Sequence, residues 1–290
     1  MKLIKPSVEI RVQGAGDDGM FEHIEWAGRH CYKSHDKTTA TSAREFVGRI
    51  AKSGHGSVLE HGTIYLAIPN EVDARKYIVN PYSKVVRCKA PDGEWYAVTT
   101  NYRVIVEKNW DLDLMYQCEP TPCHEKRITA KFVCDRSISH ELVRHRVFTY
   151  SQESQRYCNY NKDKFGAQVT FIKPSWWDVA TDSKEEFKEA LLKAEDAYLK
   201  AVKAWDERKP DKRFRTGFKG NPLSPQMARM ILPNATKTEL IMTGFESDWE
   251  FFFKLRCSQA AHPDARYLAN KLKSLITRNN ESEKSKEDLG

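Results

Sequence analysis

The sequence has no apolar run long enough to cross a bilayer. Its first residues, Met-Lys-Leu-Ile-Lys-Pro-Ser, lack the long apolar stretch of a secretory signal, so we expect a soluble, cytoplasmic protein without a membrane partner. The 7 cysteines are odd in number and have no tight regular spacing, which argues against a disulfide framework and for reduced thiols. The chain has neither an internal repeat nor a long unbroken basic stripe.

The closest approach to a set of metal ligands is Cys118, Cys123 and His124, in a short Pro-containing segment. This segment lacks a second ligand pair at a recognised spacing, so we expect no metal site. The formal net charge of +7 suits a phosphate-bearing ligand and equally suits nucleic acid, so charge alone leaves both classes open. A length of 290 residues with 40% hydrophobic content is enough for one large domain or two small ones.

Capping residues and apolar periodicity predict several helices. Ser42 and Glu45 form a capping-box pattern for a helix over 42–53, and Asp135 can cap a helix that runs to Arg146. Three further helices are expected to begin at Ser183, at Ser247 and at Pro263. The first of these carries an apolar stripe that we interpret as core-facing: Phe187, Leu191, Ala194, Tyr198, Ala201 and Trp205.

Runs of β-branched and aromatic residues predict strands at 63–68, 102–106 and 128–133. The last residues, 279–290, are charged and poor in apolar side chains, so we expect them to form a disordered tail.

The most informative stretch of the chain begins at the expected helix end with Arg144, His145 and Arg146. It continues through a polar run, which we expect to be a loop, to Ser154 and Arg156. Guanidinium groups beside hydroxyl, amide and carboxyl groups are suited to bidentate capture of phosphate and of planar heterocycles. The alternative interpretation is that basic residues in the last turn of a helix simply stabilise the negative end of its dipole. The polar run contains no Gly or Pro, and it repeats the residue types that bind phosphate, which favours a ligand site.

The whole pattern at 144–156 resembles the signature of the flavin-dependent thymidylate synthases. Two segments before it, Ala27–Tyr32 and His55–His61, are similar to the family's Ala-Arg segment and to its segment that ends in Glu-His. Two segments after it, Met227–Pro233 and Leu255–Arg256, are similar to the family's Ala-Arg then Leu-Pro element and to its late Leu-Arg. These matches follow one another in the family's order.

The resemblance implies an α+β enzyme with a central, mostly antiparallel sheet flanked by helices, assembled as a homotetramer. The catalytic domain is expected to span 1–278, with an insertion at about 69–127 that adds a hairpin or lobe. The implied reaction is the methylation of dUMP to dTMP with methylenetetrahydrofolate as one-carbon donor and FAD reduced by NADPH. In such an enzyme the cofactor supplies the chemistry and the protein supplies positioning and electrostatics.

The resemblance also implies roles for residues that match the family's positions, in sites assembled from several subunits. For FAD these residues are Cys31, His55, Ser57, Glu60, Arg144, His145, Arg146 and Gln152. For dUMP they are Glu141, Arg144, Gln152, Glu153, Ser154, Gln155, Arg156, Arg229 and Arg256. Arg256 is the expected catalytic residue, because a fixed cation facing the uracil ring can stabilise negative charge during its activation. Glu141 stands where the family usually has Gln, and Ser151 where it usually has Asn.

Two other functions remain open. A nucleic-acid-binding protein could hold phosphates with the Arg cluster and stack bases on Tyr150, Tyr157 and Tyr160. A flavoprotein of the same fold could instead methylate a uracil in RNA. For the dUMP enzyme we expect no catalytic cysteine, although Cys158 lies close to the Arg cluster in sequence.

Overall fold

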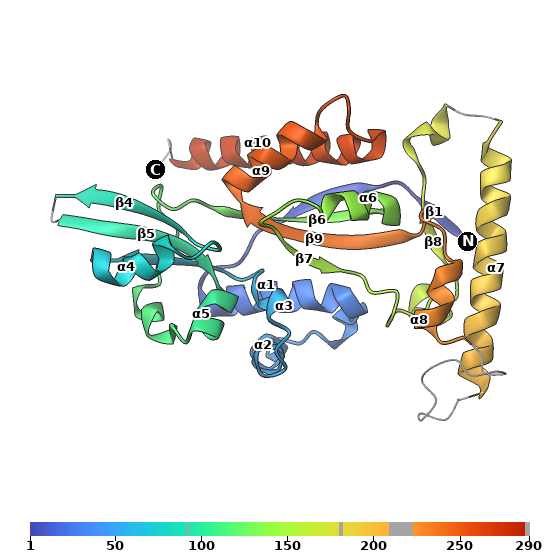
Figure 1. Cartoon of the computed structure of the whole chain (residues 1–290), viewed down its shortest axis with the longest axis horizontal. Coiled ribbons are helices and arrows are strands. Elements are labelled where there is room, and N and C mark those ends of the chain that lie inside the picture. The colour runs from blue at the N-terminus through green and yellow to red at the C-terminus, as the bar shows by residue number, and fades with distance from the viewer. Residues whose placement is uncertain (92, 180–181, 209–222, 288–290) are drawn as a thin grey trace.

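The computed structural model describes residues 1–91, 93–179, 182–208 and 223–287 (Figure 1). Its strands are β1 Lys2–Ile4, β2 Ser7–Arg11, β3 Thr63–Ile68, β4 Lys84–Ala90, β5 Gly93–Asn101, β6 Arg127–Asp135, β7 Thr149–Gln152, β8 Thr170–Ile172 and β9 Lys237–Phe245. Its α-helices are α1 Gly16–Tyr32, α2 Ser42–Lys52, α3 Gly56–Leu59, α4 Glu71–Ile78, α5 Tyr102–Lys108, α6 Arg136–Leu142, α7 Lys184–Arg208, α8 Pro225–Ala228, α9 Glu246–Arg256 and α10 Pro263–Glu287. Within these residues no helix combines the length and the apolar character that a membrane span needs.

A four-stranded antiparallel sheet in the order β2-β6-β9-β7 forms the centre of the fold. Alternate side chains of β6 and β9 point to opposite faces, so Ala130 opposite Met242 and Phe132 opposite Leu240 give one face an apolar surface. Helices α6, α9 and α10 cover this face with Leu142, Trp249, Phe252, Leu268 and Leu272, among other buried side chains. The expected α+β fold with a mostly antiparallel sheet is confirmed.

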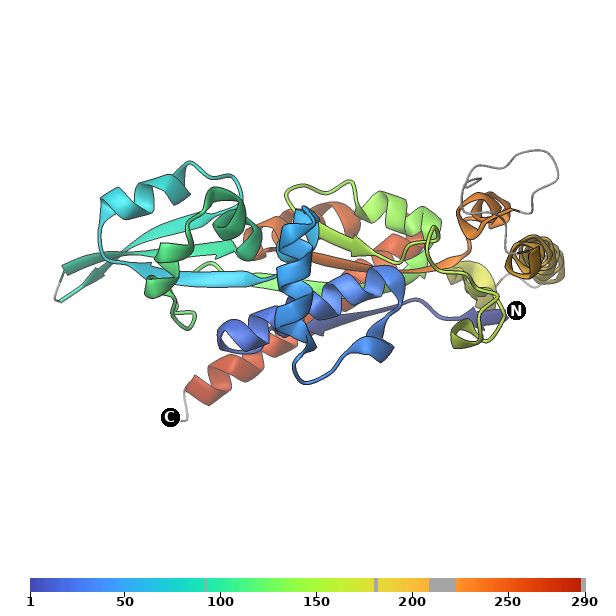
Figure 2. The same cartoon turned by 90° about the horizontal axis from the view of Figure 1, so that it is seen from below.

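The opposite face of this sheet is lined by polar side chains and covered by α1 and α3 (Figure 2). The fully buried His61 bonds Thr243 through Nδ1 (2.8 Å) and Ser151 through Nε2 (3.0 Å). His23 of α1 bonds Thr129 in the same layer, at 3.0 Å. Because burial lowers the pKa of both imidazoles, these histidines are neutral structural groups that satisfy the hydroxyls of the sheet.

Residues 63–126, which we call the lobe, contain a separate three-stranded sheet in the order β3-β5-β4. Its apolar core is shared with α1, α2 and α3, since Leu66 and Tyr77 belong to the same cluster as Met20, Phe46 and Leu59. The expected hairpin is present as β4 and β5. The lobe leaves and rejoins the rest of the chain at one place, since Arg127 donates to the Glu60 carbonyl (3.0 Å) and to Thr63 Oγ1 (3.3 Å). The strands expected at 63–68 and 128–133 are confirmed.

The strand expected at 102–106 is wrong, because this segment is the helix α5. The Asn101 side chain accepts from the backbone N–H of Val104 and caps the helix at its N-terminus, while Asn109 ends it in the left-handed conformation. These two caps decide the local structure against the β-branched composition of the segment.

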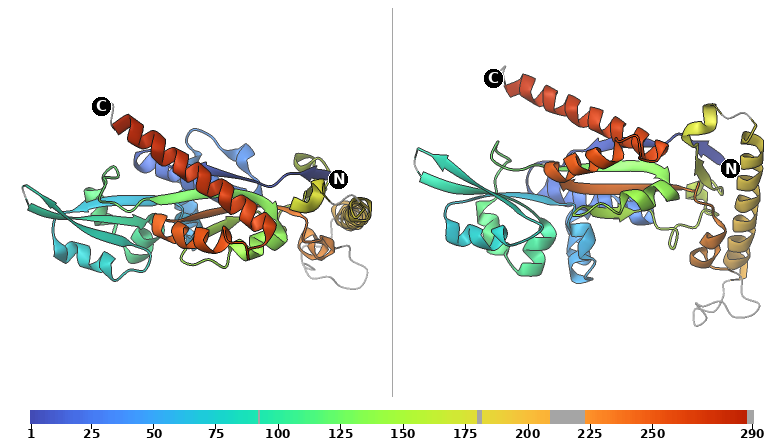
Figure 3. Two further views of the ribbon diagram at one scale, coloured as in Figure 1. Left: turned by 90° about the horizontal axis from the view of Figure 1, so that it is seen from above. Right: turned by 45° about the horizontal axis from the view of Figure 1, so that its top comes forward.

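At the other end of the molecule, β1 and β8 form a short parallel pair beside α7. The helix expected from Ser183 is confirmed as α7, and its apolar stripe packs against Cys158, Tyr160 and Phe171 through Leu191 and Tyr198. The helix expected at Pro263 is α10, which crosses the central sheet diagonally in Figure 3.

Helix α10 continues to Glu287, so the expectation of a disordered tail is wrong for 279–287. These residues contain no Gly or Pro and extend a helix that is already anchored by Leu268 and Leu272. Residues 288–290 lie outside the described part of the chain.

Two of the caps predicted from the sequence are also corrected. Helix α2 covers the expected range, but Ser42 does not form the capping box, since its hydroxyl donates to Glu25 Oε2 at 2.9 Å. Helix α9 begins at Glu246 rather than at Ser247, because the Asp248 carboxylate accepts from the backbone N–H of Phe245 at 3.3 Å. Ser247 bonds Glu125 instead.

Candidate active site

The signature turn, defined as residues 143–148, joins the end of α6 to the start of β7. Asp135 caps α6 as expected, by accepting from Ile138 N, but the helix ends at Leu142 and not at Arg146. Tyr150, which lies outside the helix, donates to the His145 carbonyl of the turn (2.6 Å), and its hydroxyl also lies 3.1 Å from the carbonyl of Leu142, the last helical residue. The signature then continues as the strand β7, where we had expected a loop.

Arg256, at the end of α9, holds this turn with three of its nitrogens. Its Nη1 pairs with Glu141 Oε2 at 2.5 Å, its Nη2 donates to the Glu141 carbonyl at 2.7 Å, and its Nε donates to His145 Nε2 at 2.8 Å. The Arg256 side chain is 17% exposed, so the partner that its burial requires comes from within the chain. We call Glu141, His145 and Arg256 the Arg256 cluster.

His145 is a neutral imidazole in this arrangement. Burial and then the neighbouring Arg256 lower its pKa to about 4. Since Nε2 accepts from Arg256, the ring proton is assigned to Nδ1. The ring also packs edge-on against Phe252, with centroids 4.8 Å apart, which fixes its orientation.

Arg144 and Arg146 flank His145 and point their side chains to solvent. Among the described residues, neither guanidinium has a recorded ion pair. Ser57 and His55 are also exposed, at the start of α3, and this helix is tied to β7 by Thr149 Oγ1 donating to the Ser57 carbonyl at 3.2 Å. The structure thus leaves these four predicted cofactor residues accessible.

Glu60, the other predicted cofactor residue of this segment, is paired with Arg103 of the lobe. Arg103 also donates to Glu107 at 2.7 Å, so one guanidinium holds two carboxylates. The predicted flavin region and the lobe therefore meet at Glu60.

A second group of predicted residues gathers around Thr238 of β9. Gln152 Nε2 donates to Ser139 Oγ (2.9 Å) and to Thr238 Oγ1 (3.3 Å), and Arg136 Nη1 lies 3.5 Å from the same Thr238 oxygen. Burial lowers the pKa of Arg136, and the nearby Arg229 lowers it further, although Tyr160 and Glu153 act in the opposite direction. Two guanidiniums thus lie near one another, and no ion pair is recorded for either within the described chain. This arrangement favours binding of an anion.

Sequence reasoning missed Arg136. A signal for it was available, because a cation in the first turn of α6 opposes the helix dipole and therefore needs another reason to be there.

Glu153 is 2% exposed and belongs to a buried group of ions. Its carboxylate lies 2.6 Å from Lys237 and accepts from Tyr160 at 3.0 Å, while Lys237 lies 2.7 Å from Glu239. Lys33 pairs with Glu239 and lies 3.7 Å from Glu153. Burial alone would raise the pKa of Glu239, but the two lysines lower it to about 2. In this chain Glu153 is thus satisfied by protein partners.

The remaining predicted dUMP residues follow β7. Ser154 donates its backbone N–H to the Cys31 carbonyl at 2.9 Å, which places the turn against the end of α1. Gln155 is buried, and its Nε2 has no partner among the described residues. Arg156 is exposed and lies over Tyr157, with its Cζ 5.3 Å from the ring centroid. An unpaired buried amide beside an exposed cation is available for a ligand.

The two cysteines close to this region are poor nucleophiles. Cys158 is fully buried, and burial raises the pKa of its thiol to about 12. Burial also raises the pKa of Cys31. Both side chains are thiols at neutral pH.

In one chain, therefore, the structure brings together the Arg256 cluster and, separately, Gln152 with Arg136 and Arg229. The third member of the candidate metal-ligand set Cys118, Cys123 and His124 uses both of its ring nitrogens within the protein. His124 Nε2 contacts the Leu66 carbonyl at 3.1 Å, and its Nδ1 bonds Thr121.

A family model described as "Thymidylate synthase complementing protein" (Thy1) matches residues 106–279, which is more than half of the chain. The chain belongs to the Thy1 family. Its resemblance to flavin-dependent thymidylate synthases is thereby confirmed. The Thy1 match includes the signature, the Arg256 cluster and the residues around Thr238.

Curated relatives of this Thy1 chain carry the name "Flavin-dependent thymidylate synthase". The protein from Mycolicibacterium vanbaalenii is 28% identical over 255 residues, which are 87% of this chain and 73% of that protein. The protein from Geobacter sulfurreducens is 33% identical over 141 residues, which are 49% of this chain and 52% of that protein. A solved structure of the UMP/dUMP methylase PolB from Streptomyces cacaoi, bound with 5-Br dUMP, aligns with a TM-score of 0.42 and 15% identity, over 96% of this chain and 93% of that one.

Proposed function

We propose that this Thy1 chain is a cytoplasmic flavin-dependent thymidylate synthase. It methylates dUMP to dTMP, with methylenetetrahydrofolate as one-carbon donor and FAD reduced by NADPH. Family membership carries this conclusion, and the curated relatives share the name of that activity. The Arg-rich signature of the chain, on a turn that Arg256 and Tyr150 fix by hydrogen bonds, supports this activity.

The exposed residues of the signature fit the binding of FAD. Arg144 and Arg146 present guanidiniums without recorded partners among the described residues, and Ser57 adds a hydroxyl on the neighbouring helix. The pyrophosphate of FAD is an anion that such donors bind well. Bound FAD supplies the hydride chemistry, while these residues bind and orient it.

The residues around Thr238 suit the phosphate of dUMP. Arg136 and Arg229 supply two positive charges, while Gln152 already donates to Ser139 and Thr238 and holds this region in place. Gln155, whose Nε2 has no partner among the described residues, and the exposed Arg156 follow in the turn after β7. Phosphate binding would neutralise the repulsion between Arg136 and Arg229, so these residues favour the dianion over neutral uridine.

We assign Arg256 to electrostatic catalysis. Glu141 and His145 bind three of its nitrogens, and its remaining N–H groups, which have no recorded partner among the described residues, can donate to a uracil oxygen. A guanidinium held in advance needs no reorganisation when charge develops on the ring. The neutral His145, which is an acceptor at Nε2, positions Arg256 rather than adding charge.

We propose that the active enzyme is a homotetramer with a single catalytic domain over 1–278 and an insertion at about 69–127. The adjacent ends of the lobe support an insertion, since Arg127 contacts both Glu60 and Thr63. Phe251 and Leu255, one turn apart on the helix that carries Arg256, are 56% and 45% exposed. Such an apolar pair beside the site suits a subunit interface.

The decisive experiment is to reconstitute the purified protein with FAD and to measure dTMP formed from dUMP, methylenetetrahydrofolate and NADPH. Wild-type protein is expected to bind flavin at micromolar concentration and to form dTMP. Arg144→Ala should weaken flavin binding, whereas Arg75→Ala, on the exposed surface of α4, is the matched control. Absence of flavin affinity in the wild type would refute the proposal, and methylation of uracil in RNA without activity on dUMP would replace it.

A further inference from the structure

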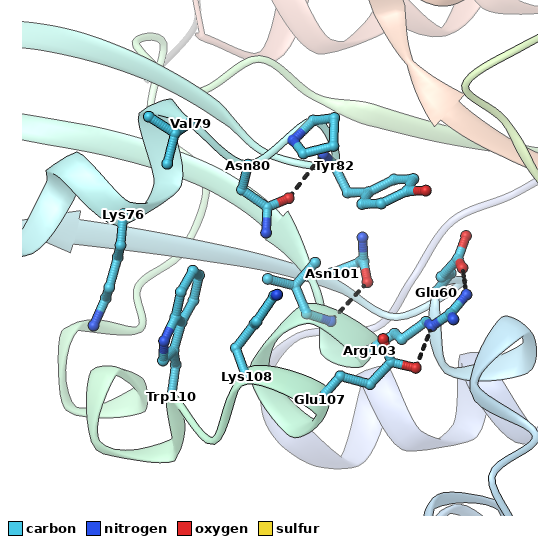
Figure 4. Close-up of a pocket in the computed structure, with 12 residues that line it drawn as sticks. Glu60, Lys76, Val79, Asn80, Tyr82, Asn101, Arg103, Glu107, Lys108 and Trp110 are labelled. Carbon is cyan, nitrogen blue, oxygen red and sulfur yellow. Dashed lines mark hydrogen bonds and ion pairs between the residues drawn. The ribbon is translucent and has the colours of Figure 1, made fainter.

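A cavity of about 440 Å³ lies in the lobe, next to Glu60 (Figure 4). Its lining combines residues of α4, the loop after it, the end of β5 and α5, together with Trp110. All of these except Glu60 belong to the lobe. The volume is within the range of small-molecule sites in proteins.

Two amide groups point into this cavity, and their orientation is fixed by the backbone. The Asn101 oxygen accepts from Val104 N at 3.2 Å, and the Asn80 oxygen accepts from Tyr82 N at 2.9 Å. Each amide nitrogen therefore points away from the backbone N–H group that its oxygen binds. Figure 4 shows both nitrogens directed into the space between the two side chains. Asn101 is only 2% exposed, so its free donor faces the cavity rather than bulk water.

Among the described residues, one of the cations that line the cavity has no recorded ion pair. Arg103 holds the carboxylates of both Glu60 and Glu107, and Lys76 lies 2.6 Å from Asp113. Lys108 directs its amine toward the amide groups, and the described residues contain no recorded ion pair for it. The cavity thus presents three donors with one positive charge and no unpaired carboxylate of its own.

Trp110 gives the cavity an aromatic wall. Its indole packs edge-on against Tyr77, with centroids 4.8 Å apart, and Lys76 Nζ lies 5.1 Å from its ring centroid. Figure 4 shows the indole between Lys76 and Lys108, so one face is covered by Lys76 and the other borders the cavity. A planar ring could stack there.

We propose that this cavity binds an aromatic carboxylate, with the ring against Trp110 and the carboxylate bonded to Lys108 and the two amides. A phosphate site usually gathers several cations, whereas the single unpaired amine here balances one carboxylate. The p-aminobenzoyl-glutamate part of a folate offers such a ring together with two glutamate carboxylates, of which one would pair with Lys108 and the other would face solvent. The inference rests on the proposed function in assigning the cavity to the folate co-substrate.

The position of the cavity gives this binding a consequence for the reaction site. Glu60 lines the cavity and belongs to the segment that contains predicted flavin contacts. Arg103 pairs with both Glu60 and Glu107, so it connects this segment to α5 of the lobe. A folate anchored by its tail in the lobe is thereby held beside the flavin region. The lobe supplies affinity for the co-substrate and takes no part in the chemistry.

The test uses calorimetric titration of the flavin-loaded full chain with p-aminobenzoyl-glutamate and with 5-formyltetrahydrofolate. Lys108→Ala and Asn80→Ala should each weaken the binding of both probes, by roughly tenfold for the lost charge-assisted contact of Lys108. Lys89→Ala is the matched control, because Lys89 is an exposed lysine of the same lobe on β4, outside the cavity. In turnover, Lys108→Ala should raise the KM for methylenetetrahydrofolate and leave kcat unchanged.

Equal binding of the probes by the wild type and Lys108→Ala, or no binding to the wild type at millimolar concentration, would overturn the inference. Competition by NADPH or inorganic phosphate that depends on Lys108 would also overturn it, by showing a phosphate ligand. If the wild type forms dTMP but Lys108 has no effect, only this inference fails. If p-aminobenzoyl-glutamate binds through Lys108 in a protein that forms no dTMP, the cavity assignment stands and the proposed function fails.

Discussion

Replacement of Arg256 by alanine tests whether this residue holds the signature turn, acts on the substrate, or does both. The change removes one ion pair and two further hydrogen bonds, to the Glu141 carbonyl and to His145. Glu141 is 35% exposed, so solvent screening reduces the value of the ion pair. We therefore expect a loss of about 2–3 kcal/mol in the free energy of unfolding, mostly from the two buried contacts.

The turnover of Arg256→Ala should fall by more than its loss of folding stability explains. Loss of a preorganised cation at the developing charge typically costs about 2–4 kcal/mol in the barrier, or roughly 30- to 1000-fold in rate. Arg256→Lys keeps the charge but loses the planar fork, so it should remain impaired. Glu141→Gln keeps an acceptor for Arg256 and the shape of the side chain, so it tests the ion pair apart from the hydrogen bonds.

Urea unfolding and dTMP formation, measured on the same preparations at a temperature where every variant is folded, separate the two roles. A destabilised Arg256→Ala protein with normal turnover would make the residue purely structural. Unchanged unfolding together with near-normal turnover would refute the reasoning on both counts.

Three further predictions concern buried groups. The pKa of His145 is about 4 in the folded protein, against 6.5 for an unfolded His. Its stabilising contribution is therefore complete above pH 6.5 and is lost as the pH falls toward 4. His145→Gln should reduce the pH dependence of the free energy of unfolding in this range by at most about 1.4 kcal/mol per pH unit, and identical pH profiles would contradict this prediction. Cys158→Ser should retain dTMP synthesis, because burial raises the pKa of that thiol to about 12; a covalent adduct with 5-fluoro-dUMP would show otherwise. Lys237→Met should destabilise the fold by about 1–3 kcal/mol in urea titrations, since Glu153 and Glu239 then share Lys33 alone, and an unshifted midpoint would disprove this.

Local sequence signals predicted much of the fold. The segments 63–68 and 128–133 are strands because their composition and their tertiary surroundings agree, and α7 follows its apolar stripe. The segment 102–106 has the same β-branched composition, yet two asparagine caps make it helical. The end of α6 could not be predicted, since the partners of its last carbonyls, Tyr150 and Arg256, come from outside the helix.

The candidate site was predictable to the extent that a motif marks it. The motif marked Arg144, Gln152 and Arg256 as candidates, but it did not show that Arg256 is bound by Glu141, because that contact joins α9 to α6 across the sheet's apolar face. The burial of Glu153 among lysines likewise depends on β9 and α1, which are distant in sequence. Arg136, a cation in the first turn of α6, was a signal in the sequence, but its link to Gln152 through Thr238 depends on the strand pairing.

The connectivity of the two sheets has a consequence for the order of folding. The lobe pairs Ala90 with Gly93 and Thr63 with Asn101, whereas the central sheet pairs Arg127 with Phe245. Closing the short loops of the lobe costs less chain entropy than bringing β6 to β9, so we expect the lobe to fold early and the central sheet late. During synthesis the lobe could fold before β9 has been translated. The edge of β6 that pairs with β9 would then remain unpaired until β9 has left the ribosome. Pulse-labelled amide exchange during refolding, with protection in β5 before β6, is the measurement that checks this order.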